Sequence, residues 1–88
     1  MTNEVQSLPI HWQLSTDQTT LSRRFEFKSY LKTIGFVNAV AWEANKMNHH
    51  PDLQVSYNHC TVNITTHDAG RLTEKDFQLA EKINYLSS

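Results

Sequence analysis

The chain has 88 residues, a formal net charge of −1 at pH 7, 39% hydrophobic residues and 19% charged residues. This length fits a single domain over residues 1–88, and the scattered lysines and arginines form no basic stripe that would favour nucleic-acid binding. One cysteine excludes an internal disulfide, and the sequence has neither a secretion signal nor an apolar run of membrane-spanning length, so we expect a cytoplasmic protein.

Two segments near the N-terminus are predicted to form a β-hairpin. In residues 10–15, Ile10, Trp12 and Leu14 alternate with polar residues, which is typical of a half-buried strand. Residues 21–27 alternate in the same way after a short connection rich in threonine and aspartate. Two such runs joined by a short polar connection indicate an antiparallel pair.

From Ser29 onward the apolar residues recur three and four positions apart, which predicts an amphipathic helix. Ser29 is a suitable N-cap, and Pro51 is expected to end the helix because proline cannot continue one. The predicted apolar stripe consists of Tyr30, Leu31, Ile34, Val37, Val40, Ala41, Ala44 and Met47.

Residues 53–58 and 60–67 are predicted to form two further strands, with a turn at Asn58 and His59. Cys60 shares one side of the second strand with Val62 and Ile64. The cysteine is therefore predicted to be a core residue rather than a nucleophile.

Residues 72–86 are predicted to form a second helix, with Thr73 and Asp76 at the N-cap and N3 positions of a capping box. The resulting order is β-β-α-β-β-α. We therefore predict an α+β domain, in which a four-stranded antiparallel sheet carries two main helices packed on one face.

The segment "KMNHHPD" (46–52) places His49 and His50 side by side at the expected end of the first helix, directly before a proline. His67 lies where the last predicted strand ends, in "HDAG". Side chains at the ends of elements are well placed to converge on a site. Because an imidazole has an ordinary pKa near 6.5, several of them together suit proton transfer near neutral pH.

Other roles for these histidines compete with proton transfer. The pair could cap the helix and interact with its dipole. Zinc binding by His49, His50, His59 and His67 is disfavoured, because adjacent histidines rarely reach one ion and the usual i, i+4 pair is absent. His11 and His59 are assigned no role. Periodicity and spacing alone therefore indicate a small α+β domain with a candidate histidine site.

Residues 12–86 resemble the pterin-4a-carbinolamine dehydratase family. The resemblance rests on "KMNHHPD" followed by "YN", then "TTHDAGRLTEKD", with "LSRRFEFKSY" and "GFVNAVAWEAN" in the expected places. Two histidine segments at the right separation are a far more specific signal than either segment alone.

The resemblance implies a hydro-lyase that dehydrates 4a-hydroxytetrahydropterin to quinonoid dihydropterin, and so recycles the cofactor of aromatic amino-acid hydroxylases. It implies His49, His50 and His67 as the catalytic residues, which also bind the substrate, and it implies no metal and no cofactor of the enzyme's own. The further substrate-binding residues that it implies are Asn48, Thr65, Thr66 and Asp68.

The chain also departs from the family pattern. Asn45 and Asn48 stand where members often carry acidic residues, and Leu53 stands where many have tryptophan. The resemblance further implies a homodimer or homotetramer and a hydroxylase as a partner. The alternative function is that of a non-catalytic pterin-binding or regulatory partner of a hydroxylase or of a transcription factor.

Overall fold

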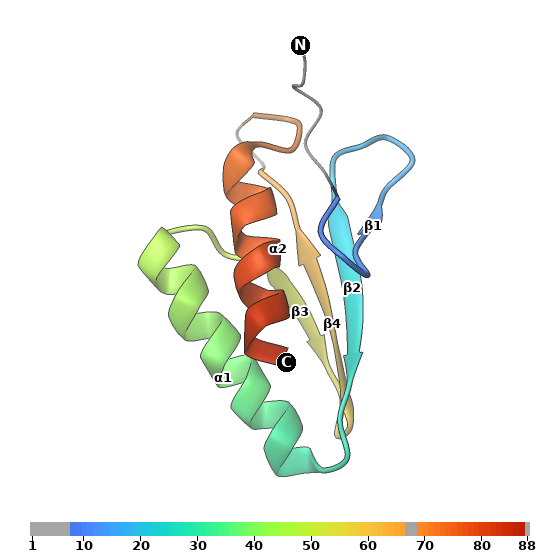
Figure 1. The fold of residues 1–88 in the computed structure, drawn as a ribbon, viewed down its shortest axis with the longest axis vertical. Helices are drawn as coiled ribbons and strands as arrows, with labels where there is room; N and C mark the ends of the chain where they lie inside the picture. The colour runs from blue at the N-terminus through green and yellow to red at the C-terminus, as the bar shows by residue number, and fades with distance from the viewer. Residues whose placement is uncertain (1–7, 67–68, 88) are drawn as a thin grey trace.

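The computed structural model describes residues 8–66 and 69–87 and confirms the α+β fold, with the order β-β-α-β-β-α (Figure 1). Both helices lie on one face of the sheet. The elements are β1 (Gln13–Leu14), β2 (Leu21–Glu26), α1 (Tyr30–Met47), β3 (Asp52–Val55), β4 (His59–Ile64) and α2 (Glu74–Ser87).

The sheet is antiparallel throughout, in the order β1-β2-β4-β3. In its register, Cys60 of the central strand β4 lies opposite Phe25 of β2 and Val55 of β3. The strand β3 therefore forms one edge of the sheet, and it follows the end of α1 directly, so the histidine pair lies at the corner between them.

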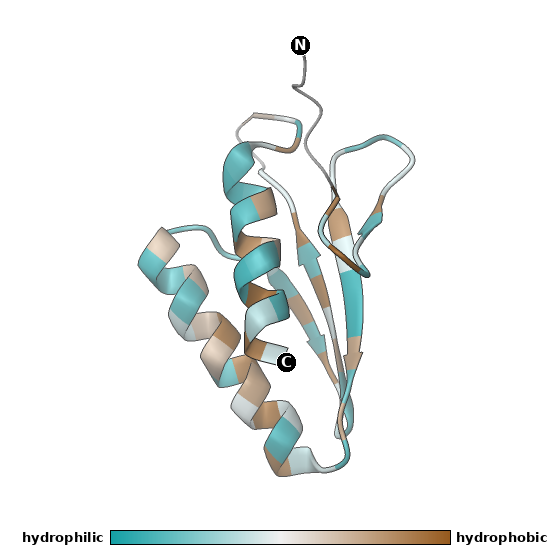
Figure 2. Ribbon diagram, viewed as in Figure 1, coloured by the Kyte–Doolittle hydropathy of each residue, from teal (hydrophilic) through white to brown (hydrophobic). Residues whose placement is uncertain are grey.

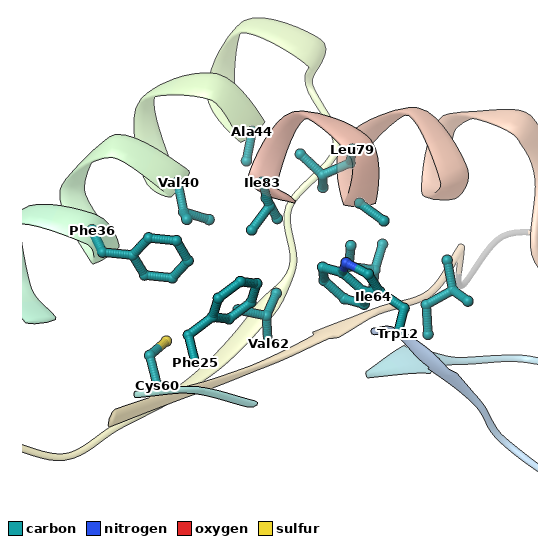
Figure 3. Packing of buried hydrophobic residues seen from close by; sticks show 12 residues of the cluster. Trp12, Phe25, Phe36, Val40, Ala44, Cys60, Val62, Ile64, Leu79 and Ile83 are labelled. Atoms are coloured by element: carbon teal, nitrogen blue, oxygen red, sulfur yellow. The ribbon is translucent and has the colours of Figure 1, made fainter. Parts of the chain in front are cut away.

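The core lies between the sheet and the two helices, where the ribbon carries many hydrophobic residues (Figure 2). The buried apolar side chains of α1, α2, β2 and β4 point toward one another there (Figure 3). Cys60, Val62 and Ile64 are fully buried, as their alternation predicted. Burial raises the pKa of the Cys60 thiol, because the thiolate would be poorly solvated there. Cys60 therefore packs as a small apolar residue, in agreement with the sequence analysis.

The first strand is much shorter than predicted, because residues 9–12 form a turn. The Trp12 N–H donates to the Pro9 carbonyl at 3.1 Å, and His11 adopts a left-handed φ of 71°. Trp12 is buried as expected and donates its indole N–H to Asn84 on α2. Ile10 and Leu14 are 67% and 41% exposed, so the prediction of one apolar face over residues 10–15 was wrong.

The buried stripe of α1 is rotated relative to the predicted stripe. Tyr30 and Leu31 are 59% and 80% exposed, whereas Phe36 and Thr33 are buried. The Thr33 hydroxyl contacts the carbonyl oxygens of Ser29 and Tyr57, each at 2.9 Å. The spacing of apolar residues does not identify Thr33 as buried, because threonine is polar. It can be buried because its hydroxyl is hydrogen-bonded inside the fold.

The turn between β3 and β4 was predicted one residue too late. The Ser56 N–H donates to the His59 carbonyl at 2.8 Å, which leaves Tyr57 and Asn58 as the two turn residues. His59 is already the first residue of β4. At the other end of the chain, α2 begins at Glu74, directly after the predicted N-cap Thr73.

Candidate functional site

The helix α1 ends before the histidine pair, and Asn48 rather than Pro51 ends it. Asn48 adopts a left-handed conformation, with φ of 53° and ψ of 41°. Its N–H donates to the Asn45 carbonyl, and the His49 N–H donates to the Ala44 carbonyl, each at 3.1 Å. These two bonds form a Schellman motif, for which asparagine is suited because it tolerates left-handed backbone. The prediction that Pro51 ends the helix was therefore wrong.

The first histidine of the pair turns toward α2. Nε2 of His49 lies 2.6 Å from Oδ1 of Asp76, and the two residues are separated by 27 positions in the sequence. The His49 side chain is only 11% exposed, and the Asp76 side chain is fully buried. The imidazole therefore bonds a buried carboxylate rather than the carbonyl groups at the end of α1, so the ring of His49 does not act as a helix cap.

The carboxylate of Asp76 is held by further donors through its other oxygen. Oδ2 accepts a hydrogen bond from the Thr66 hydroxyl at 2.5 Å and from the Thr73 N–H at 2.7 Å. The bond from Thr73 is the N3-to-N-cap half of the predicted capping box. A carboxylate in the first turn of α2 is also stabilised by the helix dipole. Asp76 thus joins the ends of α1, β4 and α2.

This arrangement selects one protonation pattern at His49. An ionised carboxylate only accepts hydrogen bonds, so the ring atom that faces Asp76 must carry a hydrogen. That atom is Nε2. In the neutral ring Nδ1 is then the basic nitrogen, and it has no hydrogen-bond partner within residues 8–66 and 69–87. With this tautomer, Nδ1 is the ring nitrogen of His49 that remains able to accept a hydrogen bond.

The second histidine faces a different space. His50 is exposed and lines a hollow of about 460 Å³ between α1 and the start of β3. The other lining residues are Asn38, Ala41, Trp42, Ala44, Asn45, Pro51 and Leu53. The two adjacent histidines thus lie in different surroundings: His49 bonds the buried Asp76, and His50 lines the hollow. The Schellman motif separates them, because it turns the chain sharply between the helix and the strand.

The remaining candidate residues lie around this corner. Thr66 and His49 bond the same carboxylate, that of Asp76. The Thr65 hydroxyl instead donates to the Thr19 carbonyl at 2.6 Å and so connects the end of β4 to the β1–β2 connection. Asn48 is exposed beside the pair. Their contact with a substrate stays a prediction.

His67 and Asp68 lie outside the described residues, so their predicted roles are neither supported nor contradicted. The described residue just before them, Thr66, contacts Asp76.

Sequence reasoning recognised Asp76 only as a helix-capping residue and did not consider Trp42. The "LTEKD" motif contained the signal for Asp76, because an acidic N3 residue close to a histidine segment can serve both a helix and an imidazole. No periodic signal distinguishes Trp42 from the other apolar residues of α1. Its 67% exposure identifies it only in the folded structure.

Neither a cluster of metal-binding side chains nor a membrane-spanning helix occurs in the described part of the chain. No three histidine, cysteine, aspartate or glutamate side chains within residues 8–66 and 69–87 are close enough together to hold a metal ion. Over the same part of the chain, neither helix has the length and apolar character needed to cross a membrane.

Residues 1–86 match the family model described as pterin 4 alpha carbinolamine dehydratase. A protein of Legionella pneumophila (strain Corby) named "Putative pterin-4-alpha-carbinolamine dehydratase" is 45% identical over 84 residues, which cover 96% of this chain and 74% of that protein. A protein of the same name from Nitrosomonas eutropha is 46% identical over 84 residues, which cover 96% of this chain and 73% of that protein.

Two solved structures have a similar fold. The transcriptional coactivator/pterin dehydratase from Brucella melitensis superposes with a TM-score of 0.86 and 31% identity, over 91% of this chain and 85% of that one. A pterin dehydratase-like RuBisCO assembly factor of the α-carboxysome shares the fold alone, with a TM-score of 0.76 and 20% identity, over 88% of this chain and 89% of that one. The match to the family model and the similarity to these proteins, together with the histidine pair at the end of α1, show that the chain belongs to the pterin-4α-carbinolamine dehydratase family.

Proposed function

We propose that this protein dehydrates 4a-hydroxytetrahydropterin to quinonoid dihydropterin, as a 4a-hydroxytetrahydrobiopterin dehydratase. The observation that carries the proposal is the bond between His49 and the buried Asp76, at 2.6 Å. A buried carboxylate that orients an imidazole is a common device of acid–base catalysis, because it fixes the tautomer and stabilises the protonated ring. Membership of the family supports the same activity.

The reaction requires one base and one acid. The base removes the proton from N5 of the pterin, and the electron pair of that N–H bond forms a double bond between N5 and C4a. The bond between C4a and the hydroxyl oxygen breaks, and the acid protonates the departing oxygen, so water leaves. Protons are transferred without any change in oxidation state, so imidazoles alone can supply the chemistry.

We assign these proton transfers to His49, His50 and His67. His49 is positioned by Asp76, His50 lines the neighbouring hollow, and the chain reaches His67 directly after Thr66. Asn48, Thr65, Thr66 and Asp68 are proposed to bind the substrate around them. In the cell, the substrate would come from a pterin-dependent aromatic amino-acid hydroxylase, which is the proposed partner. The quinonoid product would need a two-electron reduction by a separate reductase before the hydroxylase could use the pterin again, and cytoplasmic recycling fits this role.

The direct test uses chemically generated 4a-hydroxytetrahydropterin and follows its dehydration by absorbance. We expect the purified protein to accelerate the reaction well beyond the spontaneous rate, which is measured in the same buffer and subtracted. The acceleration should persist after extensive chelation, because the proposed groups act as proton carriers. If the protein adds nothing to the spontaneous rate, the non-catalytic binding function replaces the catalytic one.

A second expectation concerns self-association. The edge strand β3 presents backbone groups that no strand within residues 8–66 and 69–87 pairs with, and Val55 and Tyr57 beside that edge are 44% and 68% exposed. Such an edge favours pairing with a second copy. Sedimentation equilibrium at micromolar concentration should therefore give a multiple of 10.2 kDa. Val55→Lys should lower that mass, whereas a wild-type mass near the monomer value would exclude the proposed homo-oligomer.

A further inference from the structure

We propose that Trp42 is the aromatic wall on which the planar pterin ring lies, and that it sets the affinity of the site. This inference rests on the proposed function and names the residue that would recognise the substrate's ring. Trp42 is 67% exposed, although it is one of the largest apolar side chains of the protein. It lines the same hollow as His50, so an aromatic face and an imidazole border one space.

The composition of the hollow indicates the chemistry of its occupant. Asn38, Trp42 and Asn45 follow one another at spacings of four and three on α1, so they form one strip along the helix. Leu53 and Pro51 close the opposite side. None of the residues that line the hollow carries an acidic or a Lys/Arg side chain.

An uncharged, partly aromatic hollow of about 460 Å³ lies within the size range of small-molecule sites. Two carboxamides offer both donors and acceptors, which match the amide and amino groups on the edge of a neutral pterin. The indole offers a flat face for stacking, and such contacts tolerate different ring substituents. We therefore infer that the ring stacks on Trp42, with its N5 and C4a edge toward His50.

The test measures the affinity for 7,8-dihydrobiopterin, a stable reduced pterin, by quenching of tryptophan fluorescence and by calorimetry. In the wild type, the exposed Trp42 should be quenched by the ligand, whereas the buried Trp12 should contribute little. Trp42→Ala should weaken binding about fivefold or more, as loss of one stacking aromatic does for planar bases. The Michaelis constant should rise in parallel with kcat little changed, because stacking stabilises substrate and transition state about equally.

Two further variants separate stacking from other effects. Leu31→Ala is the matched control, because Leu31 is 80% exposed on the same helix but does not line the hollow. It should leave the affinity unchanged. In the Trp42→Ala background, Leu53→Trp should restore part of the affinity, because it returns an indole to the same hollow.

Three outcomes would overturn the inference. An active wild type whose affinity and Michaelis constant do not change in Trp42→Ala rejects the role of Trp42 alone and leaves the dehydratase function standing. A fall in sedimentation mass shared by Trp42→Ala and Leu31→Ala would mean that Trp42 covers a subunit interface instead. A wild type that neither binds the pterin nor accelerates its dehydration rejects the proposed function and this inference together.

Discussion

Asp76→Asn is expected to lower kcat by about 10²-fold or more while the protein stays folded. The two oxygens of Asp76 now accept from His49 on one side and from Thr66 and Thr73 on the other. A carboxamide has only one oxygen, and the donor N–H of Thr73 belongs to the backbone and cannot be reversed. The oxygen of the asparagine should therefore stay with Thr66 and Thr73, and its NH₂ group should face His49.

The consequence for His49 is a change of tautomer. A ring atom that faces an NH₂ donor must accept, so Nε2 would lose its hydrogen and Nδ1 would gain it. Nδ1, to which we assign the proton transfer, would then be a donor in the neutral ring, which is the wrong state for a base. The loss should appear in kcat rather than in the Michaelis constant, since the side chain of Asp76 is fully buried and cannot touch the substrate directly.

Two measurements and one control variant check this prediction. Long-range ¹H–¹⁵N correlation spectra report the tautomer of His49 directly, and the pH profile of kcat should change along with it. Asp52→Asn is the matched control, because it removes the same charge from an exposed position on β3 and should leave kcat unchanged. A fully active Asp76→Asn variant that keeps the hydrogen on Nε2 would show that Asp76 only caps α2.

The contribution of the Asp76 carboxylate to the stability of the fold can be estimated from Asp76→Ala. That variant leaves the hydroxyl of Thr66 and the N–H of Thr73 without their acceptor. Buried unsatisfied donors cost about 1–3 kcal/mol, so its melting temperature should fall clearly. Comparing it with Asp76→Asn separates the folding role of the carboxylate from its effect on His49.

The order of the elements could be predicted from the sequence, because both the alternation of apolar residues in the strands and their three-and-four spacing in the helices are strong. The alternation of Cys60, Val62 and Ile64 is fully reflected in their burial, and Ser29 caps α1 through its hydroxyl. The errors occurred where a local hydrogen bond outweighed hydropathy. The turn at Pro9 shortened β1, and left-handed Asn48 ended α1 before the proline could.

The site was only half predictable, for a related reason. The motif identified the histidines, yet spacing could not show that His49 and His50 turn to different sides of the corner. That division depends on the Schellman motif and on the position of Asp76, which lies 27 residues away in the sequence. The exposure of Trp42 depends in turn on how α1 rotates against the sheet. A single-helix pattern does not determine that rotation, because α1 has apolar residues on both sides.

The other large effect is expected from His50→Ala and His67→Ala, each of which should lose about 10²-fold or more of kcat, as removal of a positioned acid or base does. His50 is exposed in the hollow and no described residue bonds its ring, so its removal should leave the fold and the melting temperature nearly unchanged. A loss of rate without a loss of stability would therefore report on chemistry.

Added imidazole provides the decisive measurement for His50. If the ring transfers a proton, free imidazole should enter the open hollow of His50→Ala and restore part of the rate, in proportion to its concentration. His59→Ala is the matched control, because the ring of His59 bonds Asn58 at the β3–β4 turn and should not affect the rate. An active His50→Ala variant that does not respond to imidazole would remove His50 from the mechanism and leave the proton transfers to His49 and His67.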